Sequence, residues 1–222
     1  NRIESVFIAE SPLDCIAHRA IKGNDNTFYV SFNGSLSWEQ IKTINNILDK
    51  HRNRIDTTKF SFALGSDNDS AGTNYDIMFI ARQLKHRFKG ESSVIHQENF
   101  RKEISFEAGE VAPKLANAIQ NVINSQKETT EQSPIKISTN NNLITINYPD
   151  KDYFAERTVC KSILSTNILP FTKLEKAQLN DWNDDLIVCR SNKVSHQYLC
   201  ENKDSFIKDV EQFKKGAKKK KK

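Results

Sequence analysis

The sequence lacks two features that would assign it to common classes of protein. Its four cysteines, Cys15, Cys160, Cys189 and Cys200, are far apart and include no Cys-x-x-Cys pair. That pattern is typical of a reducing compartment rather than of a disulfide framework, and the spacing around His196 is poor for zinc. No apolar run reaches membrane-spanning length, and no signal peptide is visible. We therefore expect a cytoplasmic protein without a membrane partner.

The body of the chain also lacks net positive charge. The sequence has 33 Lys and Arg residues against 28 Asp and Glu residues, but seven of the lysines stand in residues 214–222. Without those seven, 26 basic residues face 28 acidic ones, a net charge of −2. The body is therefore not a generally basic nucleic-acid binder. Any contact with DNA must depend on a local patch, on the tail, or on Mg²⁺ that bridges to phosphate.

Strand and helix patterns alternate regularly over the first part of the chain. Short apolar strands are predicted at residues 5–9, 28–32 and 59–64, and helices at 12–21, 37–55 and 71–88. Ser11 and Ser37 are the expected N-caps of the first two helices, and Pro12 suits a first helical position. Strand alternating with helix three times implies a parallel sheet with right-handed crossovers, so we predict an α/β fold.

The later part of the chain has a looser pattern. We interpret residues 1–97 as the α/β core and residues 98–166 as an inserted α+β segment. Its expected elements are a helix at 112–125, a hairpin at 135–148 and a helix at 152–165. Residues 167–213 then return to the core and end in a helix at 203–213, and residues 214–222 form a disordered basic tail. The fourth strand of the sheet is either 93–96 or 168–171, and the pattern does not decide between them.

Acidic residues directly follow two of the predicted strands. Glu10 comes after the first strand, and Asp67 and Asp69 come after the third. Open α/β folds carry their chemistry at this edge of the sheet, and side chains two residues apart on extended backbone project to the same side. Gly72 then lets the chain turn into a helix. Carboxylates aimed at one place suit a hard divalent cation, so we predict a site for Mg²⁺, with Mn²⁺ as the alternative.

These segments resemble the Toprim domain, which bacterial-type primases, topoisomerases and some nucleases share. The family has a Glu after its first strand and an Asp-x-Asp after its third, where this chain has Glu10 and Asp67-Asn68-Asp69. Gly34 at the end of the second strand is a third match. Asp181-Trp182-Asn183-Asp184 is similar to a Lys-Asp-Trp-Asn-Asp signature in Toprim proteins of plasmids and mobile elements, although Asn180 replaces the Lys. The resemblance implies a Toprim-like Rossmannoid parallel sheet flanked by helices.

The resemblance also implies roles for individual residues. Asp67 and Asp69 become the principal metal ligands, and Glu10 becomes a general acid/base or a further ligand. The residues expected to support them are Asp14, Gly34, Gly72, Asp181 and Asp184.

Structural interpretations of the same residues stay open. The Asp67-Asn68-Asp69 segment also suits a polar turn with a helix cap, Asp14 suits the first turn of its helix, and Asp181 and Asp184 suit a turn. Trp182 is expected to be a packing anchor. The histidines without visible partners are expected to be ordinary surface or helix residues, namely His18, His51, His86 and His96.

The expected function is that of a Mg²⁺-dependent nucleic-acid enzyme, most like a primase-type nucleotidyltransferase in the replication or mobilisation of a mobile element. A Toprim-type nuclease has the same carboxylates, with water as the acceptor in place of a sugar hydroxyl. A noncatalytic DNA-binding module of a mobilisation or replication protein is the third reading. The expected partner is single-stranded DNA, together with further domains upstream of Asn1, because the chain enters a strand almost at once.

Overall fold

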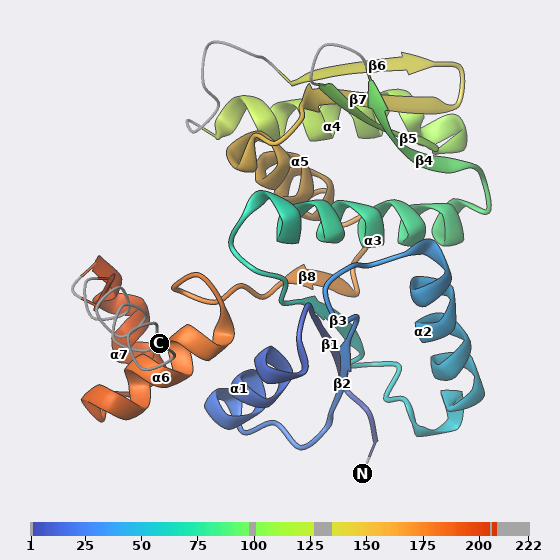
Figure 1. The fold of residues 1–222 in the computed structure, drawn as a ribbon. Coiled ribbons are helices and arrows are strands. Elements are labelled where there is room, and N and C mark those ends of the chain that lie inside the picture. Colours follow the sequence, from blue (N-terminus) through green and yellow to red (C-terminus); the bar gives the residue numbers. More distant parts are fainter. Residues whose placement is uncertain (1, 98–100, 127–134, 205, 208–222) are drawn as a thin grey trace.

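Two four-stranded sheets and the helices around them make up the structure, a computed structural model (Figure 1). It describes residues 2–97, 101–126, 135–204, 206 and 207. Most of the predicted helix at 203–213 and the whole basic tail at 214–222 lie outside the described residues. Within the described part of the chain, no helix is long and apolar enough to cross a membrane.

The first sheet is entirely parallel, which confirms the predicted α/β class. Its strands have the order β2-β1-β3-β8. They are β1 (Ser5–Ala9), β2 (Thr27–Ser31), β3 (Ser61–Leu64) and β8 (Thr172–Leu174). In β1, Val6 to Ala9 are buried, as expected for a central strand that is covered on both faces.

Helices cover both faces of this sheet. Helices α1 (Pro12–Lys22) and α6 (Trp182–Asn192) pack on one face, and α2 (Trp38–Lys50) and α3 (Ser70–Phe88) pack on the other. Ser11 caps α1, and Ser37 caps α2 in a capping box with Gln40, so both predicted N-caps are confirmed.

Helix α2 ends earlier than the pattern predicts. The chain leaves it after Lys50 and forms the short 3₁₀ turn η1 (Arg52–Arg54). Ile47, which was expected on the inner face with Ile41, Ile44 and Leu48, is 37% exposed. The apolar stripe is therefore narrower than the sequence suggests.

The second sheet is antiparallel and has the order β4-β5-β7-β6. Its strands are β4 (Ser92–Gln97), β5 (Arg101–Glu107), β6 (Lys136–Asn140) and β7 (Leu143–Pro149). The 3₁₀ turn η2 (Gly109–Val111) and the helices α4 (Ala112–Ser125) and α5 (Tyr153–Ser165) belong to the same half of the chain, and α7 (His196–Glu201) follows α6. The predicted hairpin and the two predicted helices are confirmed.

The second sheet corrects the expected division of the chain. Strand β4 pairs with β5 along its whole length, so a boundary between residues 97 and 98 separates two paired strands. Neither candidate for the fourth parallel strand is right, because residues 93–96 lie in the antiparallel sheet and the parallel strand begins at Thr172, after residues 168–171. The sequence pattern missed β5, where Lys102 points inward together with Ile104 and Phe106 and interrupts the apolar alternation.

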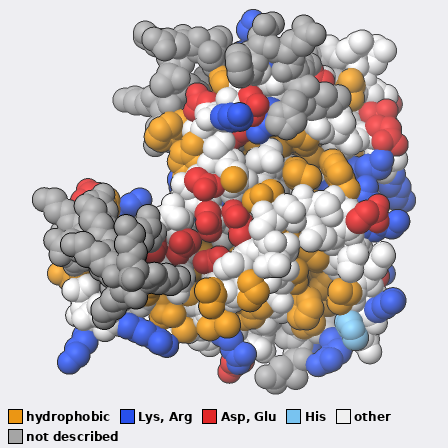
Figure 2. Space-filling view, viewed as in Figure 1, with side chains coloured by type: hydrophobic (Ala, Val, Ile, Leu, Met, Phe, Trp, Pro, Cys, Tyr) orange, Lys and Arg blue, Asp and Glu red, His pale blue; other side chains and the backbone are white. Residues whose placement is uncertain are grey.

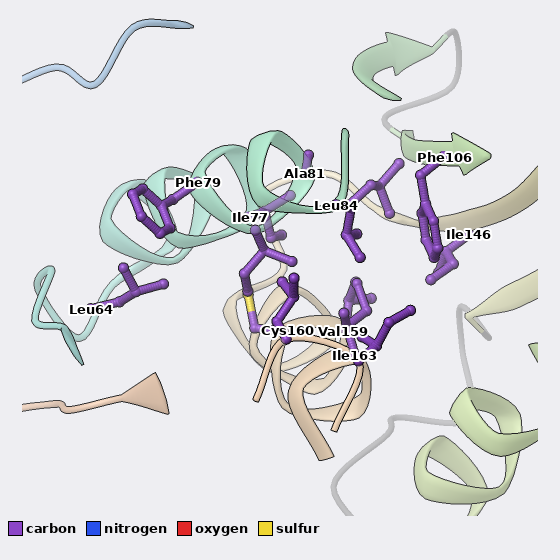
Figure 3. Packing of buried hydrophobic residues seen from close by; sticks show 14 of the residues in the cluster. Leu64, Ile77, Phe79, Ala81, Leu84, Phe106, Ile146, Val159, Cys160 and Ile163 are labelled. Atoms are coloured by element: carbon purple, nitrogen blue, oxygen red, sulfur yellow. The ribbon is translucent and has the colours of Figure 1, made fainter. Parts of the chain in front are cut away.

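One hydrophobic core joins the two sheets through α3. Figure 3 shows Ile77 and Leu84 of α3 facing Val159 and Ile163 of α5, with Phe106 of the second sheet nearby. All five side chains are at most 1% exposed. Helix α3 therefore carries apolar contacts to the parallel sheet on one side and to the second half of the chain on the other.

A buried ionic cluster fixes the second sheet against α3. The Nζ of Lys102 lies 2.8 Å from carboxylate oxygens of both Asp150 and Glu156, and it donates to Asn74 at 3.3 Å. The second carboxylate oxygen of Glu156 accepts a hydrogen bond of 2.6 Å from the hydroxyl of Ser70, the first residue of α3. The Lys102 and Glu156 side chains are 5% and 0% exposed, so both charges depend on this cluster for their compensation.

We predict that Lys102→Met lowers the free energy of unfolding by about 3–5 kcal/mol, because the carboxylates of Asp150 and Glu156 are left buried without their cation. Urea unfolding measures the change. The matched control is Lys136→Met at an exposed position of β6, for which we expect a change within about 0.5 kcal/mol. Equal effects of the two substitutions would contradict a structural role for the buried charge.

Candidate acidic site at the carboxyl edge of the parallel sheet

Five of the eight predicted site residues line one hollow at the carboxyl edge of the parallel sheet, and Asp69, Gly72 and Asp184 are not among its lining. Strands β1, β2 and β3 run in the same direction, so Glu10 after β1, Gly34 after β2 and Asp67 after β3 emerge at one edge. A hollow of about 380 Å³ opens there. Its lining includes Glu10, Asp14, Gly34, Asp67, Asp181 and Asn183. Figure 2 shows acidic side chains gathered in the hollowed middle of the face, near the beginning of α3.

The Asp67-Asn68-Asp69 segment has both a structural and an electrostatic part in this site. Asp69 is the N-cap of α3, and its carboxylate accepts a hydrogen bond of 2.8 Å from the amide of Gly72. The amide of Asp67 donates to the Glu10 carboxylate at 3.3 Å. The segment after β1 and the segment after β3 therefore approach closely. One carboxylate oxygen of Asp69 is used for capping α3.

Gly72 makes this close approach possible. A Cβ atom at this position would lie 2.9 Å from Oε1 of Glu10 and 2.7 Å from the backbone nitrogen of Asp67. It would lie closer still to the carbonyl oxygen of Asp67. The sequence predicts that Gly72 supports the turn into the helix, and the structure gives a steric reason. Any other side chain would push against the Asp67-Asn68-Asp69 segment, which we call the acidic loop.

Asn68 joins the acidic loop to a segment far away in the sequence. Its side-chain amide donates to the carbonyls of Ala177 and Leu179, both at 2.6 Å, and its backbone amide donates to Asn180 at 2.9 Å. This clamp brings Asp181 to the hollow. Sequence reasoning gave Asn68 no role, because its partners are more than 100 residues away.

The structure separates the two aspartates of the Asp181-Trp182-Asn183-Asp184 segment. Asp181 lines the hollow, and it is also the N-cap of α6, because its carboxylate accepts from the amide of Asp184 at 2.7 Å. Asp184 is only 3% exposed and is not among the residues that line the hollow. Asp14 is 5% exposed and accepts a hydrogen bond of 2.6 Å from the hydroxyl of Ser11.

Burial and neighbouring negative charges raise the pKa values of three carboxylates in the hollow, those of Asp67, Glu10 and Asp14. Burial is the largest cause that raises the pKa of Asp67, to about 7, and the charges of Glu10, Asp14, Asp181 and Asp69 add to it. Burial also raises the pKa values of Glu10 and Asp14. A cation placed among these groups would relieve both effects, because it stabilises the ionised carboxylates.

Lys176 brings a positive charge to the back of the site. Its Nζ lies 2.7 Å from the buried carboxylate of Asp76 and donates to the carbonyls of Ser66, at 2.7 Å, and Asp67, at 3.4 Å. Its charge offsets part of the rise that burial causes in the pKa of Glu10. The sequence prediction missed Lys176, since it follows β8, a strand that was not predicted. A lysine therefore contacts the Asp67 segment, although it stands four residues before Asn180 in the sequence.

Trp182 is a packing anchor, as expected. It is 1% exposed, and its ring lies against Phe7 and His18, with centroids 5.8 and 4.6 Å away. The expectation that His18 has no partner is wrong, because its Nε2 lies 3.0 Å from the Glu175 carboxylate. His196, considered above for zinc, contacts Asp185 through Nε2 at 2.9 Å. The contact of Trp182 with His18 holds α6 against α1, and the contact of His196 with Asp185 holds α7 against α6.

The donor chemistry of the hollow suits a hard cation, although the arrangement is not that of a preformed metal site. Among the described residues, no group of three His, Cys, Asp or Glu side chains is placed so that it could hold a metal ion. Mg²⁺ commonly takes only one or two protein carboxylates and completes its shell with water and substrate phosphates. Glu10, Asp67 and the remaining oxygen of Asp69 are the groups that would hold it.

Comparison with known proteins gives no match to this chain, whether with protein-family models, with curated proteins or with solved structures.

We predict that Asp67→Asn changes how stability depends on pH in metal-free buffer. The pKa of Asp67 is about 7 in the folded protein against an ordinary value of 3.8, so the unfolded chain releases the proton first as the pH rises. The free energy of unfolding of the wild type should therefore fall as the pH rises from about 4 to 7. After allowance for partial solvent exposure, we expect this fall to be about 1–3 kcal/mol larger than the fall for Asp67→Asn. Urea unfolding across this range measures the difference, and parallel curves for the two proteins would contradict the raised pKa.

We predict that Gly72→Ala lowers the free energy of unfolding by about 1–3 kcal/mol, because the new methyl group overlaps the backbone of Asp67 and the Glu10 carboxylate. Helix propensity alone favours the opposite result by about 1 kcal/mol. Thermal and urea unfolding measure the effect, with Ala71→Ser at the exposed neighbouring position as the control. A stabilised Gly72→Ala protein would show that the close approach is not required.

Proposed function

We propose that this chain is a Toprim-like domain and acts as a Mg²⁺-dependent enzyme on nucleic acid, most like a primase-type nucleotidyltransferase of a mobile element. The observation that supports the proposal is the meeting of Glu10, Asp67 and Asp181 in one hollow at the carboxyl edge of a parallel sheet. Burial, together with the charges of the neighbouring carboxylates, raises the pKa of Asp67 to about 7. Crowded carboxylates of this kind are costly to stability and are typical of functional sites.

The proposed roles follow from the surroundings of each carboxylate. Asp67 and Asp69 would hold Mg²⁺, which neutralises phosphate charge and orients the attacking oxygen. Glu10 is the proposed general acid/base, since burial raises its pKa above the ordinary value of a glutamate. Lys176 would keep the acidic loop in place from behind through its bonds to the carbonyls of Ser66 and Asp67.

A noncatalytic nucleic-acid-binding module is the second candidate, and a different observation favours it. Asp69 and Asp181 each use a carboxylate oxygen to cap a helix. In the described parts of the chain, no three His, Cys, Asp or Glu side chains are arranged to hold a metal ion. In this reading the carboxylates shape the edge of the sheet. Nucleic acid then binds elsewhere on the molecule, and its binding does not depend on Glu10.

Calorimetric titration with Mg²⁺ and Mn²⁺ tests the proposal, followed by primer synthesis on a single-stranded DNA template with nucleoside triphosphates. We expect Asp67→Asn/Asp69→Asn to abolish metal binding and to lower turnover by at least about 100-fold. Asn at position 69 retains the ability to cap α3, so the loss reports on charge rather than on folding. The control is Asp25→Asn/Asp204→Asn, which removes two exposed carboxylates outside the site.

The outcomes separate the candidate functions. Release of short fragments from single-stranded DNA in Mg²⁺, without nucleotides, would replace the polymerase with a nuclease that uses the same carboxylates. Primer synthesis that survives Asp67→Asn/Asp69→Asn would overturn the proposed site. Absence of turnover with either metal, combined with DNA binding that Glu10→Gln leaves unchanged, would establish the noncatalytic module.

A further inference from the structure

A groove between α2 and α3 concentrates positive charge on a body whose net charge is −2. It has a volume of about 450 Å³. Its lining residues are Lys42, Asn45, Asn46, Asp49, Arg82, Lys85, His86 and Lys89. Four cations therefore face one carboxylate, beside two amide side chains that can both donate and accept hydrogen bonds. Figure 2 shows Lys and Arg side chains gathered where α3 ends beside α2, at the right of the view.

The charge of this groove is largely not neutralised from within the protein. Lys42 and Lys89 form no ion pair with any residue that the structure describes. The guanidinium of Arg82 lies over the ring of Trp38, 5.7 Å from its centroid, which fixes the position of the charge without cancelling it. Lys85 pairs with Glu91, but Glu91 is 81% exposed, and a pair of this kind is weak and screened by salt.

An aromatic hollow adjoins the groove. His86 lines both, and the second hollow, of about 320 Å³, includes Phe60, Phe62 and Phe171. Phe171 is 51% exposed, so its ring is accessible at the surface beside the groove. Cations that follow a sugar–phosphate backbone, next to aromatic rings on which bases stack, are the two elements of single-strand recognition.

We propose that the groove between α2 and α3 and the adjoining aromatic hollow bind single-stranded nucleic acid. The inference rests on the proposed nucleic-acid function, but it uses none of the carboxylates of the acidic site. Lys42, Arg82 and Lys89 contact phosphates, Asn45 and Asn46 offer hydrogen bonds to phosphate or base edges, and Phe171 stacks on a base.

The position of the groove and the aromatic hollow indicates that they hold nucleic acid away from the acidic site. Phe60 and Phe171 precede β3 and β8, so the hollow lies at the amino edge of the parallel sheet, opposite the acidic hollow. Helix α3 has 19 residues and spans about 28 Å between the two edges. The groove therefore holds a strand at a distance from the proposed reaction centre. Its loss should weaken binding and raise KM, and it should leave kcat unchanged.

Fluorescence anisotropy with labelled oligothymidylate and oligouridylate of about 20 nucleotides tests the proposal for DNA and for RNA. The variant is Lys42→Ala/Arg82→Ala/Lys89→Ala in the full chain. We expect at least a tenfold weaker affinity, on the order of three lost phosphate contacts, and a salt dependence of log K that is shallower by about 2. Lys85, His86 and Arg87 stay unchanged, since cations in the last turn of α3 also stabilise the helix.

The matched control is Lys114→Ala/Lys136→Ala/Arg190→Ala, which removes two lysines and one arginine from exposed positions outside the groove. We expect at most about a twofold change in affinity for this protein. Phe171→Ala should weaken binding about fivefold or more, whereas Phe154→Ala, which removes a ring that is 55% exposed on α5, should have no effect. If thermal unfolding shows that an alanine variant is destabilised, glutamine at the same three positions repeats the test.

Equal affinities of the groove variant and its matched control would overturn the proposal, and so would a wild-type protein that binds neither oligonucleotide. Binding to only one of the two identifies the strand as DNA or RNA. Failure of the proposed enzymatic function has a different signature. In that case Asp67→Asn/Asp69→Asn would leave turnover unchanged, or the wild type would show no turnover. Oligonucleotide affinity would still depend on Lys42, Arg82 and Lys89.

Discussion

Two-sided burial of α3 is the constraint on which the rest of the structure depends. One side of the helix packs on the parallel sheet, and the other packs on α5 and the antiparallel sheet. Ile77, Phe79, Ile80 and Leu84 are at most 1% exposed, so neither side faces water. Burial of such side chains contributes about 1.5–3 kcal/mol each. Because both sheets share this helix, they form one core rather than two independent domains.

The ends of α3 carry opposite electrostatic environments. At its beginning, Asp69 caps the helix, and its charge adds to those that raise the pKa of Asp67 in the acidic hollow. At its end, Lys85 and Lys89 belong to the basic groove. A helix favours negative charge at its first turn and positive charge at its last, so the dipole of α3 partly compensates both clusters. The separation of the two clusters along one rigid element prevents them from neutralising each other.

Local patterns in the sequence predicted the parts of the fold that depend on local contacts. The helix and strand periods, the Ser11 and Ser37 caps and the convergence of Glu10 and Asp67 at one edge all follow from short segments together with the rules for parallel sheets. The parts that escaped prediction depend on distant partners. In the sequence, Lys102 is expected at the surface, and only the folded protein places Asp150 and Glu156 beside it. A lysine at this inward position interrupts the apolar alternation, so β5 was not predicted.

The same limit applies to the acidic site. Nothing near Asn68 indicates its bonds to Ala177 and Leu179, and nothing near Lys176 indicates its contact with Asp76. Asp184 shows the converse, since it belongs to the expected motif but is buried in the first turn of α6, away from the lining of the hollow. Motif spacing therefore identified the edge of the sheet, and tertiary contacts decided which side chains reach it.

The clamp formed by Asn68 has a consequence for the order in which the molecule assembles. Its hydrogen bonds to Ala177 and Leu179 span 109 and 111 residues, so the acidic edge is among the least local parts of the structure. Non-local pairings form slowly, because the intervening chain must be ordered first. During synthesis at about 5–20 residues per second, the partners of Asn68 appear roughly 5–20 s after it. Until then β3 is an open edge strand, and the acidic loop lacks the segment that completes it.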